Sequence, residues 1–332
     1  MSKRKANLLL NALSENRDPD PASLATKRVR NRKTKAQQEA EEKKGNATMC
    51  VFDPKKMIEN FTMMIYGARR VGKTHVASYI ISKIHERFKE VWLMSETIHL
   101  QPDAWTFIPE PNRLDHFDEE LIMRIYKDQE RKIDEVKRLL EPRKLHGDRL
   151  RDEVTRCVPA ILLILDDIIN DPAVAGSSVL SKLFISGRHL RISLMFLSQT
   201  PARGATICRL MRTNVDYCLC SEMDTQDDSE TAASLYFAKN GLKEGIQRLA
   251  GLTDEKHKFA VAQVHIRGKR TLEDHTCSFM APKKIPPFKL KCAEQSEGLL
   301  HIKNPSARKP GNRVGSVDQL AFASPRVMYC QL

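Results

Sequence analysis

The octapeptide Gly67-Ala68-Arg69-Arg70-Val71-Gly72-Lys73-Thr74 follows the pattern G-x-x-x-x-G-K-[ST]. It lies between an apolar run, 61–66, and a helix-like segment, 74–88. Glycines in such a turn let several backbone N–H groups point at one anion, and the dipole of the following helix favours the same anion. The succession of strand, glycine turn and helix therefore predicts a phosphate-binding loop, or P-loop.

Each part of this loop has an expected role. The backbone from Gly67 to Gly72 is predicted to surround the phosphates of a nucleoside triphosphate, with Lys73 reaching the β- and γ-phosphates and Thr74 ligating Mg²⁺. A glycine-rich turn that matches by chance is the alternative. The apolar residues after the loop argue against it, because they recur at helical spacing and give the following helix a face that can cover a sheet. They are Ala77, Ile80, Ile81, Ile84 and Phe88.

Two carboxylates end a second apolar run. Residues 161–165 read Ile-Leu-Leu-Ile-Leu, and Asp166 and Asp167 follow. An acid at the end of such a strand holds Mg²⁺ in P-loop enzymes, so we assign Asp166 to the metal. The adjacent Asp167 is predicted to act as the base that activates water. The alternative is an ordinary strand that ends in a polar turn.

Gln199 follows a third apolar run, 192–197. In open α/β sheets ligands bind at the carboxyl ends of the strands, so Gln199 is predicted to lie beside the P-loop and to sense the γ-phosphate or its water. Arg188 precedes the same run and belongs to the opposite end. It cannot reach the chain's own phosphates from there, and we expect it to act as an arginine finger in a neighbouring subunit or as a plain surface arginine.

A second group of arginines, Arg203, Arg209 and Arg212, lies after Gln199. These residues could line a DNA channel, serve as the finger or only contact solvent, and the sequence leaves the three roles open.

Strand and helix signals alternate from about residue 49, which is typical of a parallel sheet covered by helices on both faces. The charged stretch 118–156 is predicted to be a helical insertion that Pro142 and Gly147 divide into two pieces. Six segments are predicted as strands, most of them near-continuous apolar runs of the kind found in central parallel strands. They are 61–66, 90–94, 160–165, 192–198, 215–220 and 259–265.

The charge of the chain is concentrated at its two ends. Residues 1–48 contain 12 Lys and Arg against 6 Asp and Glu, and residues 281–332 contain 9 against 3. Each tail is therefore +6, and +1 of the formal net charge of +13 is left for residues 49–280. Both tails have the polar composition of disordered segments. They are suited to salt-dependent, sequence-independent attraction to DNA, whereas the ATPase-type domain 49–280 would need local arginines for the same purpose.

Composition also narrows the environment. No run of about 18 apolar residues occurs among the 332 residues, so no stable membrane insertion is expected. The N-terminal apolar stretch is too short for a signal peptide, which favours a soluble, intracellular protein. The 8 cysteines form no C-x-x-C pair, and we expect reduced thiols.

Taken in order, these motifs resemble the FtsK–HerA class of P-loop ATPases and, within it, the genome-packaging ATPases of large double-stranded DNA viruses and of virophage or polinton-like elements. The resemblance covers about residues 55–265. It rests on GARRVGKT at 67–74, ILLILDD at 161–167, GRH at 187–189 with the run to Gln199, and RTNVD at 212–216. The P-loop by itself identifies only an NTPase, and the order of all the motifs is much more specific.

The resemblance implies a RecA-like fold with an extra strand between the P-loop strand and the strand that ends in Asp166. It further implies a homo-oligomeric ring of six or five subunits, ATP and Mg²⁺ at subunit interfaces, and double-stranded DNA driven through the pore into a preformed capsid. Capsid or portal-type proteins would be partners, in the host cytoplasm or nucleus during assembly, with association with the virion as a further option. Asp167 stands where many relatives have Glu, so its role as base is the less secure assignment.

Two other functions stay open from the sequence. One is a nucleoside or nucleotide kinase with a lid at 203–212. The other is a non-catalytic nucleic-acid-binding protein with a vestigial P-loop. The Asp166-Asp167 pair, Gln199 and the basic tails argue against the kinase, and the absence of any degenerate motif position argues against a vestigial P-loop.

Overall fold

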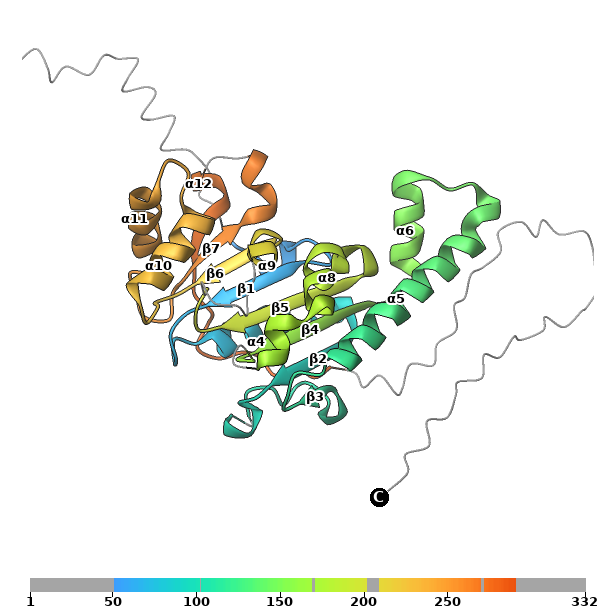
Figure 1. Cartoon of the computed structure of the whole chain (residues 1–332), viewed down its shortest axis with the longest axis horizontal. Coiled ribbons are helices and arrows are strands. Elements are labelled where there is room, and N and C mark those ends of the chain that lie inside the picture. The colour runs from blue at the N-terminus through green and yellow to red at the C-terminus, as the bar shows by residue number, and fades with distance from the viewer. Residues whose placement is uncertain (1–50, 102, 169–170, 202–208, 270–271, 291–332) are drawn as a thin grey trace, which may run out of the picture. The chain divides into compact units, whose positions relative to one another are not determined.

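The computed structural model describes residues 51–101, 103–168, 171–201, 209–269 and 272–290 (Figure 1). The predicted tail 1–48 and Arg203 lie outside these ranges, as do residues 291–332 of the predicted C-terminal tail.

A single sheet organises the described part of the chain. Its strand order is β3-β2-β4-β5-β1-β6-β7-β8. The pairs from β3 to β6 are parallel, whereas β7 is antiparallel to both β6 and β8, so the predicted mostly parallel sheet is confirmed. The strands are β1 (Thr62–Tyr66), β2 (Phe88–Ser95), β3 (Arg113–Leu114), β4 (Ala160–Asp166), β5 (Ile192–Ser198), β6 (Tyr217–Cys220), β7 (Phe259–Gln263) and β8 (Thr276–Phe279).

The centre of the sheet carries the predicted motifs. Every residue of β1, β4 and β5 is buried, which explains their unbroken apolar sequences. β5 pairs with β1 on one side and with β4 on the other. The strand that leads to Gln199 therefore separates the P-loop strand from the strand that ends in Asp166, as the resemblance implied.

Helices cover both faces of the sheet. Alternate side chains of a strand point to opposite faces, so Met63 and Ile65 of β1 join one core while Met64 and Tyr66 join the other. The first core is completed by α4 (Lys73–Ile84). The second core lies under α5 (Glu119–Leu140), α8 (Ser178–Ser186) and α11 (Leu242–Leu252). The shorter helices are α7 (Pro172–Gly176), α9 (Arg209–Thr213), α10 (Gln226–Ala232) and α12 (Leu272–His275).

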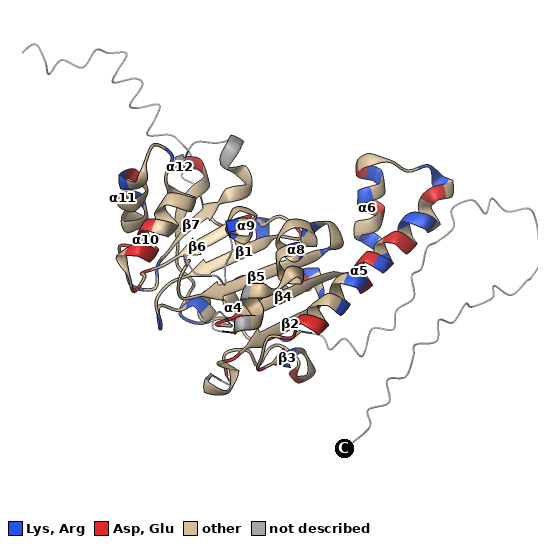
Figure 2. Cartoon of the chain, in the orientation of Figure 1, with Lys and Arg blue, Asp and Glu red and all other residues tan. Residues whose placement is uncertain are grey.

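The charged stretch 118–156 forms two helices. α5 begins after Asp118, whose carboxylate accepts a hydrogen bond from the Leu121 backbone N–H at 2.8 Å. A short 3₁₀ turn, Glu141–Arg143, separates it from α6 (Gly147–Cys157), at the position where Pro142 predicted a break. Figure 2 shows that basic and acidic residues are interspersed along α5 and α6.

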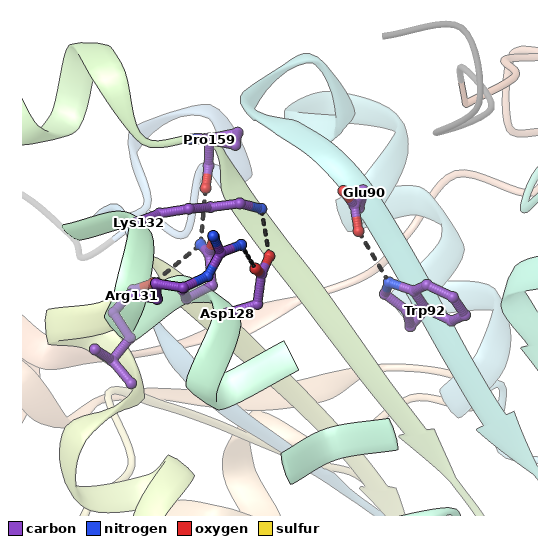
Figure 3. Close-up of polar contacts among 8 residues, drawn as sticks. Glu90, Trp92, Asp128, Arg131, Lys132 and Pro159 are labelled. Carbon is purple, nitrogen blue, oxygen red and sulfur yellow. Dashed lines mark hydrogen bonds and ion pairs between the residues drawn. The ribbon is translucent and has the colours of Figure 1, made fainter. Parts of the chain in front are cut away.

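One polar side chain anchors α5 to the sheet. Gln129 is fully buried, and its Nε2 donates to the carbonyl oxygens of Pro159 at 2.9 Å and Leu190 at 3.0 Å. These two carbonyl oxygens lie just before β4 and β5. The Gln129 amide thus provides them with a hydrogen-bond donor at a place where the helix covers them. On the outer side of α5, Asp128 binds Arg131 and Lys132 (Figure 3).

The predicted C-terminal tail begins at residue 281, and residues 281–290 of it are among those that the structure describes. The segment 281–290 lies against the domain: the Leu290 N–H donates to the Phe107 carbonyl at 3.1 Å, and the Phe288 ring lies 4.4 Å from the Phe107 ring. The Pro and Lys content of this segment resembles that of a disordered tail, but its apolar side chains find partners on α4 and on the 98–107 loop.

Within the described ranges, no helix is long and apolar enough to span a lipid bilayer. The four cysteines found there, Cys157, Cys218, Cys220 and Cys277, are free thiols.

Candidate functional site

The P-loop connects β1 to α4 through backbone that only glycine adopts easily. Gly72, directly before the helix, has φ +99°, a left-handed conformation that strains any residue with a Cβ. Gly67 is required for a different reason: a Cβ there would meet the Val71 side chain at 2.9 Å and the Glu222 carbonyl oxygen at 3.2 Å. The Ala68 N–H donates to that same carbonyl at 2.7 Å, which fixes the loop to the segment after β6.

Lys73 lies inside the curl of the loop. Its Nζ donates to the carbonyl oxygens of Gly67 at 2.8 Å and Ala68 at 3.0 Å, and the side chain is buried. Burial lowers the pKa of Lys73, and the charges of Asp167 and Asp166 oppose that shift. The ammonium group therefore lies within the field of both carboxylates, in the centre of the predicted phosphate site.

Asp166 ends β4 beside the start of α4. Its Oδ2 accepts hydrogen bonds from the Trp105 indole N–H at 3.2 Å and the Thr74 hydroxyl at 3.5 Å. Burial raises the pKa of Asp166 to about 6, and the adjacent Asp167 charge adds to the rise. A buried carboxylate whose charge is disfavoured, next to a threonine hydroxyl, is a suitable position for a divalent cation.

The next carboxylate, Asp167, faces Gln199. The Gln199 amide Nε2 donates to both oxygens of Asp167, at 3.0 and 3.1 Å, and its Oε1 accepts from Arg69 Nε at 3.2 Å. Asp167 has φ +59°, and its N–H donates to the Leu197 carbonyl at 3.2 Å. The structure therefore links the ends of β4 and β5 to the P-loop through one chain of polar contacts, from Asp167 through Gln199 to Arg69.

The donor set fits Mg²⁺ bound to a triphosphate. Within the described residues, no cluster of three His, Cys, Asp or Glu side chains could hold a metal ion by itself. Mg²⁺ is commonly held by one or two protein groups together with phosphate oxygens and water. Thr74 and Asp166 would supply those protein groups here.

The structure separates the arginines from this site. Arg188 is exposed in the 3₁₀ turn Gly187–Leu190 before β5, at the end of the strand opposite to Gln199. Its Nε contacts the neighbouring His189 ring at 3.4 Å. Arg209 and Arg212 lie on α9. Among the described residues, Arg188 makes no contact with the P-loop, Asp166 or Asp167, and the Arg212 carbonyl accepts a hydrogen bond from the Tyr236 hydroxyl at 3.1 Å.

Sequence reasoning missed three contributors. Trp105 binds Asp166, the Glu222 carbonyl holds the loop, and His257 Nδ1 lies 3.0 Å from the Val71 carbonyl oxygen. Trp105 and His257 come from loops without hydrophobic periodicity, and Glu222 acts through its backbone. The sequence carries no signal for such contacts, because each depends on a long-range approach.

Comparison with solved structures finds distant neighbours with nucleotide-binding folds. TcpA, the coupling protein of pCW3 conjugation, has a TM-score of 0.46 at 13% identity, over 67% of this chain and 60% of its own. The genome packaging NTPase B204 of Sulfolobus turreted icosahedral virus 2 has a TM-score of 0.41 at 8% identity, over 63% and 93%. EssC of Geobacillus thermodenitrificans has 0.44 at 14%, over 62% and 38%. This chain thus spans about 60% of the length of TcpA.

Among curated proteins, no sequence matches this chain. The sequence family described as Poxvirus A32 protein matches residues 49–261, which include the P-loop, both aspartates, Arg188 and Gln199. That match covers more than half of the chain and agrees with the resemblance to viral genome-packaging ATPases. The chain therefore belongs to the poxvirus A32 protein family.

Proposed function

We propose that this protein is an ATP hydrolase that drives double-stranded DNA into a preformed viral capsid. The observation that carries the proposal is the meeting of Lys73, Thr74 and the two aspartates with Gln199 at one edge of the sheet. Membership of the poxvirus A32 family supports the same function.

The residues divide the work of hydrolysis. Lys73 and the P-loop backbone bind the phosphates, and Thr74 and Asp166 would hold Mg²⁺, which would neutralise charge on the phosphate oxygens. Asp167 accepts a proton from the attacking water. The Gln199 amide donates hydrogen bonds to both oxygens of Asp167 and so orients this base. When the Asp167 carboxylate turns toward the attacking water, these hydrogen bonds break.

A second part of the proposal concerns assembly. Arg188 lies far from its own P-loop, on an exposed turn, and is available to a neighbouring molecule. We place it as a finger that completes the adjacent subunit's site in a ring of five or six subunits, with DNA in the pore. Capsid or portal-type proteins are the proposed docking partners in the host cell during virus assembly.

The site favours this function over the two alternatives. A kinase shields its phosphates from water, whereas here Asp167 and Gln199 provide a group that activates water. A vestigial P-loop would not need a lysine inside the loop or a buried aspartate beside Thr74.

The test is ATP turnover by the purified full chain with Mg²⁺, with and without double-stranded DNA. We expect DNA to stimulate hydrolysis, with no phosphate transferred to nucleosides. Lys73→Ala should reduce turnover by about 100-fold or more, since it removes a charge that stabilises the transition state. Lys83→Ala, ten residues further along α4, is the matched control and should keep normal turnover. Absence of hydrolysis in the wild-type protein with Mg²⁺ and DNA refutes the proposal.

A further inference from the structure

A cavity of about 810 Å³ lies beside the start of α4. Thr74, His75 and Ser78 line one side of it, so the cavity is continuous with the predicted Mg²⁺ and phosphate site. Phe107 lines a second side, and residues 285–289 line the third. No residue of this cavity other than Thr74 has a role in the proposed hydrolysis.

The segment 282–290 forms a strap across this cavity. At one end His75 Nε2 lies 2.8 Å from the Pro282 carbonyl oxygen, and at the other the Leu290 N–H donates to the Phe107 carbonyl at 3.1 Å. The strap is thus attached both to the residue after the P-loop and to the loop that faces it across the cavity.

The rings of Phe107 and Phe288 line the cavity between the two attachment points, and Trp105 and His85 contact these rings from outside its lining. The rings of Phe107 and Phe288 lie 4.4 Å apart, Trp105 lies 5.7 Å from Phe107, and His85 lies 5.1 Å from Phe288. Through its indole N–H, Trp105 also binds Asp166. A flat, apolar ligand that enters the cavity would therefore meet ring surfaces and prolines on the side away from the phosphates.

We propose that this cavity holds the base and ribose of the nucleotide, with Phe288 and Phe107 as the base-contacting residues; the inference rests on the proposed ATPase. The phosphates occupy the loop that ends at Thr74, so the rest of the nucleotide has to leave beside that residue. A purine ring stacks on aromatic side chains of this kind. The strap is then part of the nucleotide site and not an extension of the tail.

A second cavity, of about 890 Å³, borders the first half of the P-loop but suits a base less well. Its lining is strongly charged, with acidic residues at 222, 224, 254 and 255 and basic residues at 69, 70 and 256. Of the described residues around it, His257 supplies the only ring. The aromatic wall decides in favour of the cavity under the strap.

The experiment compares two ligands on the full chain without DNA: ATP, and inorganic tripolyphosphate, which has the phosphates but no base. Phe288→Ala should weaken ATP binding roughly tenfold and leave tripolyphosphate binding unchanged. Phe288→Tyr, which keeps the ring, should restore ATP binding. Phe279→Ala is the matched control, because Phe279 contacts Phe52 and Tyr79 outside this cavity.

Unchanged ATP affinity in Phe288→Ala overturns the proposal, and so does an equal loss for both ligands, which would show damage to the loop. If Phe279→Ala loses ATP affinity to the same extent and keeps tripolyphosphate affinity, the effect is due to general packing, and the proposal is overturned as well. Melting temperatures measured without ligand identify any variant that fails to fold, and in that case Phe107→Ala takes its place with the same expected outcome. Because DNA is absent, a failure here is distinct from a failure to translocate DNA.

Discussion

At the scale of single residues, the site contains a conflict of charges. Asp166 and Asp167 are adjacent, and Asp166 is buried; burial and the Asp167 charge raise its pKa to about 6. The Trp105 and Thr74 hydrogen bonds and the Lys73 charge counter only part of this. Without a cation the folded protein holds a carboxylate that would be more stable in water.

We therefore predict that Asp166→Asn stabilises the metal-free protein. The carboxyl pKa is 3.8 in its ordinary state and about 6 in the fold, so the fold binds its proton more tightly. Stability is then lost as pH rises from about 4 to 6, and the loss persists above pH 6. In EDTA at pH 7.5 the variant should gain about 1–3 kcal/mol in the free energy of unfolding, with little gain at pH 3.5.

Denaturant unfolding at the two pH values measures this gain, and added Mg²⁺ supplies the control. Mg²⁺ should stabilise the wild-type protein more than the variant, and the variant should have lost ATP hydrolysis. A variant less stable than wild type at pH 7.5 in EDTA would show that Asp166 is needed for the fold itself.

The residues of the phosphate and metal site could be predicted from the sequence, whereas most of their side-chain partners could not. Lys73, Asp166 and Gln199 follow apolar runs whose order in a parallel sheet brings their ends together. The side-chain partners are another matter, because nothing in the sequence around Trp105 indicates that its indole approaches Asp166. Likewise, the backbone of Arg69 is predicted to contact the phosphates, and the sequence gives no sign that its side chain contacts Gln199 at 3.2 Å.

At the scale of elements, prediction succeeded where burial is complete. β4 and β5 are buried at every position, and their apolar runs marked them within one residue. β3 was missed because its two residues are too few to show a period. β8 was missed because it has only four residues and two of them, Thr276 and Ser278, are polar, so the sequence shows no apolar run there. The strap 282–290 was assigned to the tail because its contacts exist only in the folded domain.

Helix α11 offers a second prediction. A Cβ on Gly245 would meet the Ala233 carbonyl oxygen and the Ala238 Cβ, each at 2.8 Å, whereas a Cβ on Gly251 would meet nothing within 4 Å. Gly245→Ala should lower the free energy of unfolding by about 1–3 kcal/mol through overpacking. Gly251→Ala, the matched control, should raise it by up to about 1 kcal/mol through helix propensity.

Thermal or urea unfolding of both variants gives the comparison. Equal effects of the two substitutions would mean that α11 moves away from the 233–238 segment without cost, contrary to the close packing described.

At the scale of the whole molecule, the tails are predicted to dominate DNA attraction. Residues 1–48 carry +6, and residues 291–332, with 6 Lys and Arg against 3 Asp and Glu, carry +3. Removing both segments while keeping the strap should make the plot of log affinity against log salt clearly less steep, since fewer counterions are released. ATP turnover without DNA should stay at the wild-type level. If the slope of log affinity against log salt is unchanged, arginines of the domain, and not the tails, make the DNA contact.

The role of Arg188 between subunits has its own test. Arg188→Ala and Lys73→Ala should each be nearly inactive when purified alone. Mixed together they should regain activity, because a Lys73→Ala subunit can offer Arg188 to the intact P-loop of its Arg188→Ala neighbour. The turnover rate of the mixture is compared with the sum of the separate rates. In the control mixture Arg191→Ala, at the residue directly after the turn, replaces Arg188→Ala. No gain on mixing would place Arg188 outside the neighbour's site.

β5 connects Gln199 to the turn that carries Arg188. The strand is seven residues long and spans about 23 Å. Gln199 follows one end and touches Asp167, whereas the turn with Arg188 precedes the other. β5 is paired with β1 and β4 along its length, so its two ends stay at a fixed separation within the sheet. In the proposed ring, the glutamine that orients one subunit's base and the arginine offered to the next subunit are therefore kept at a constant spacing by one strand.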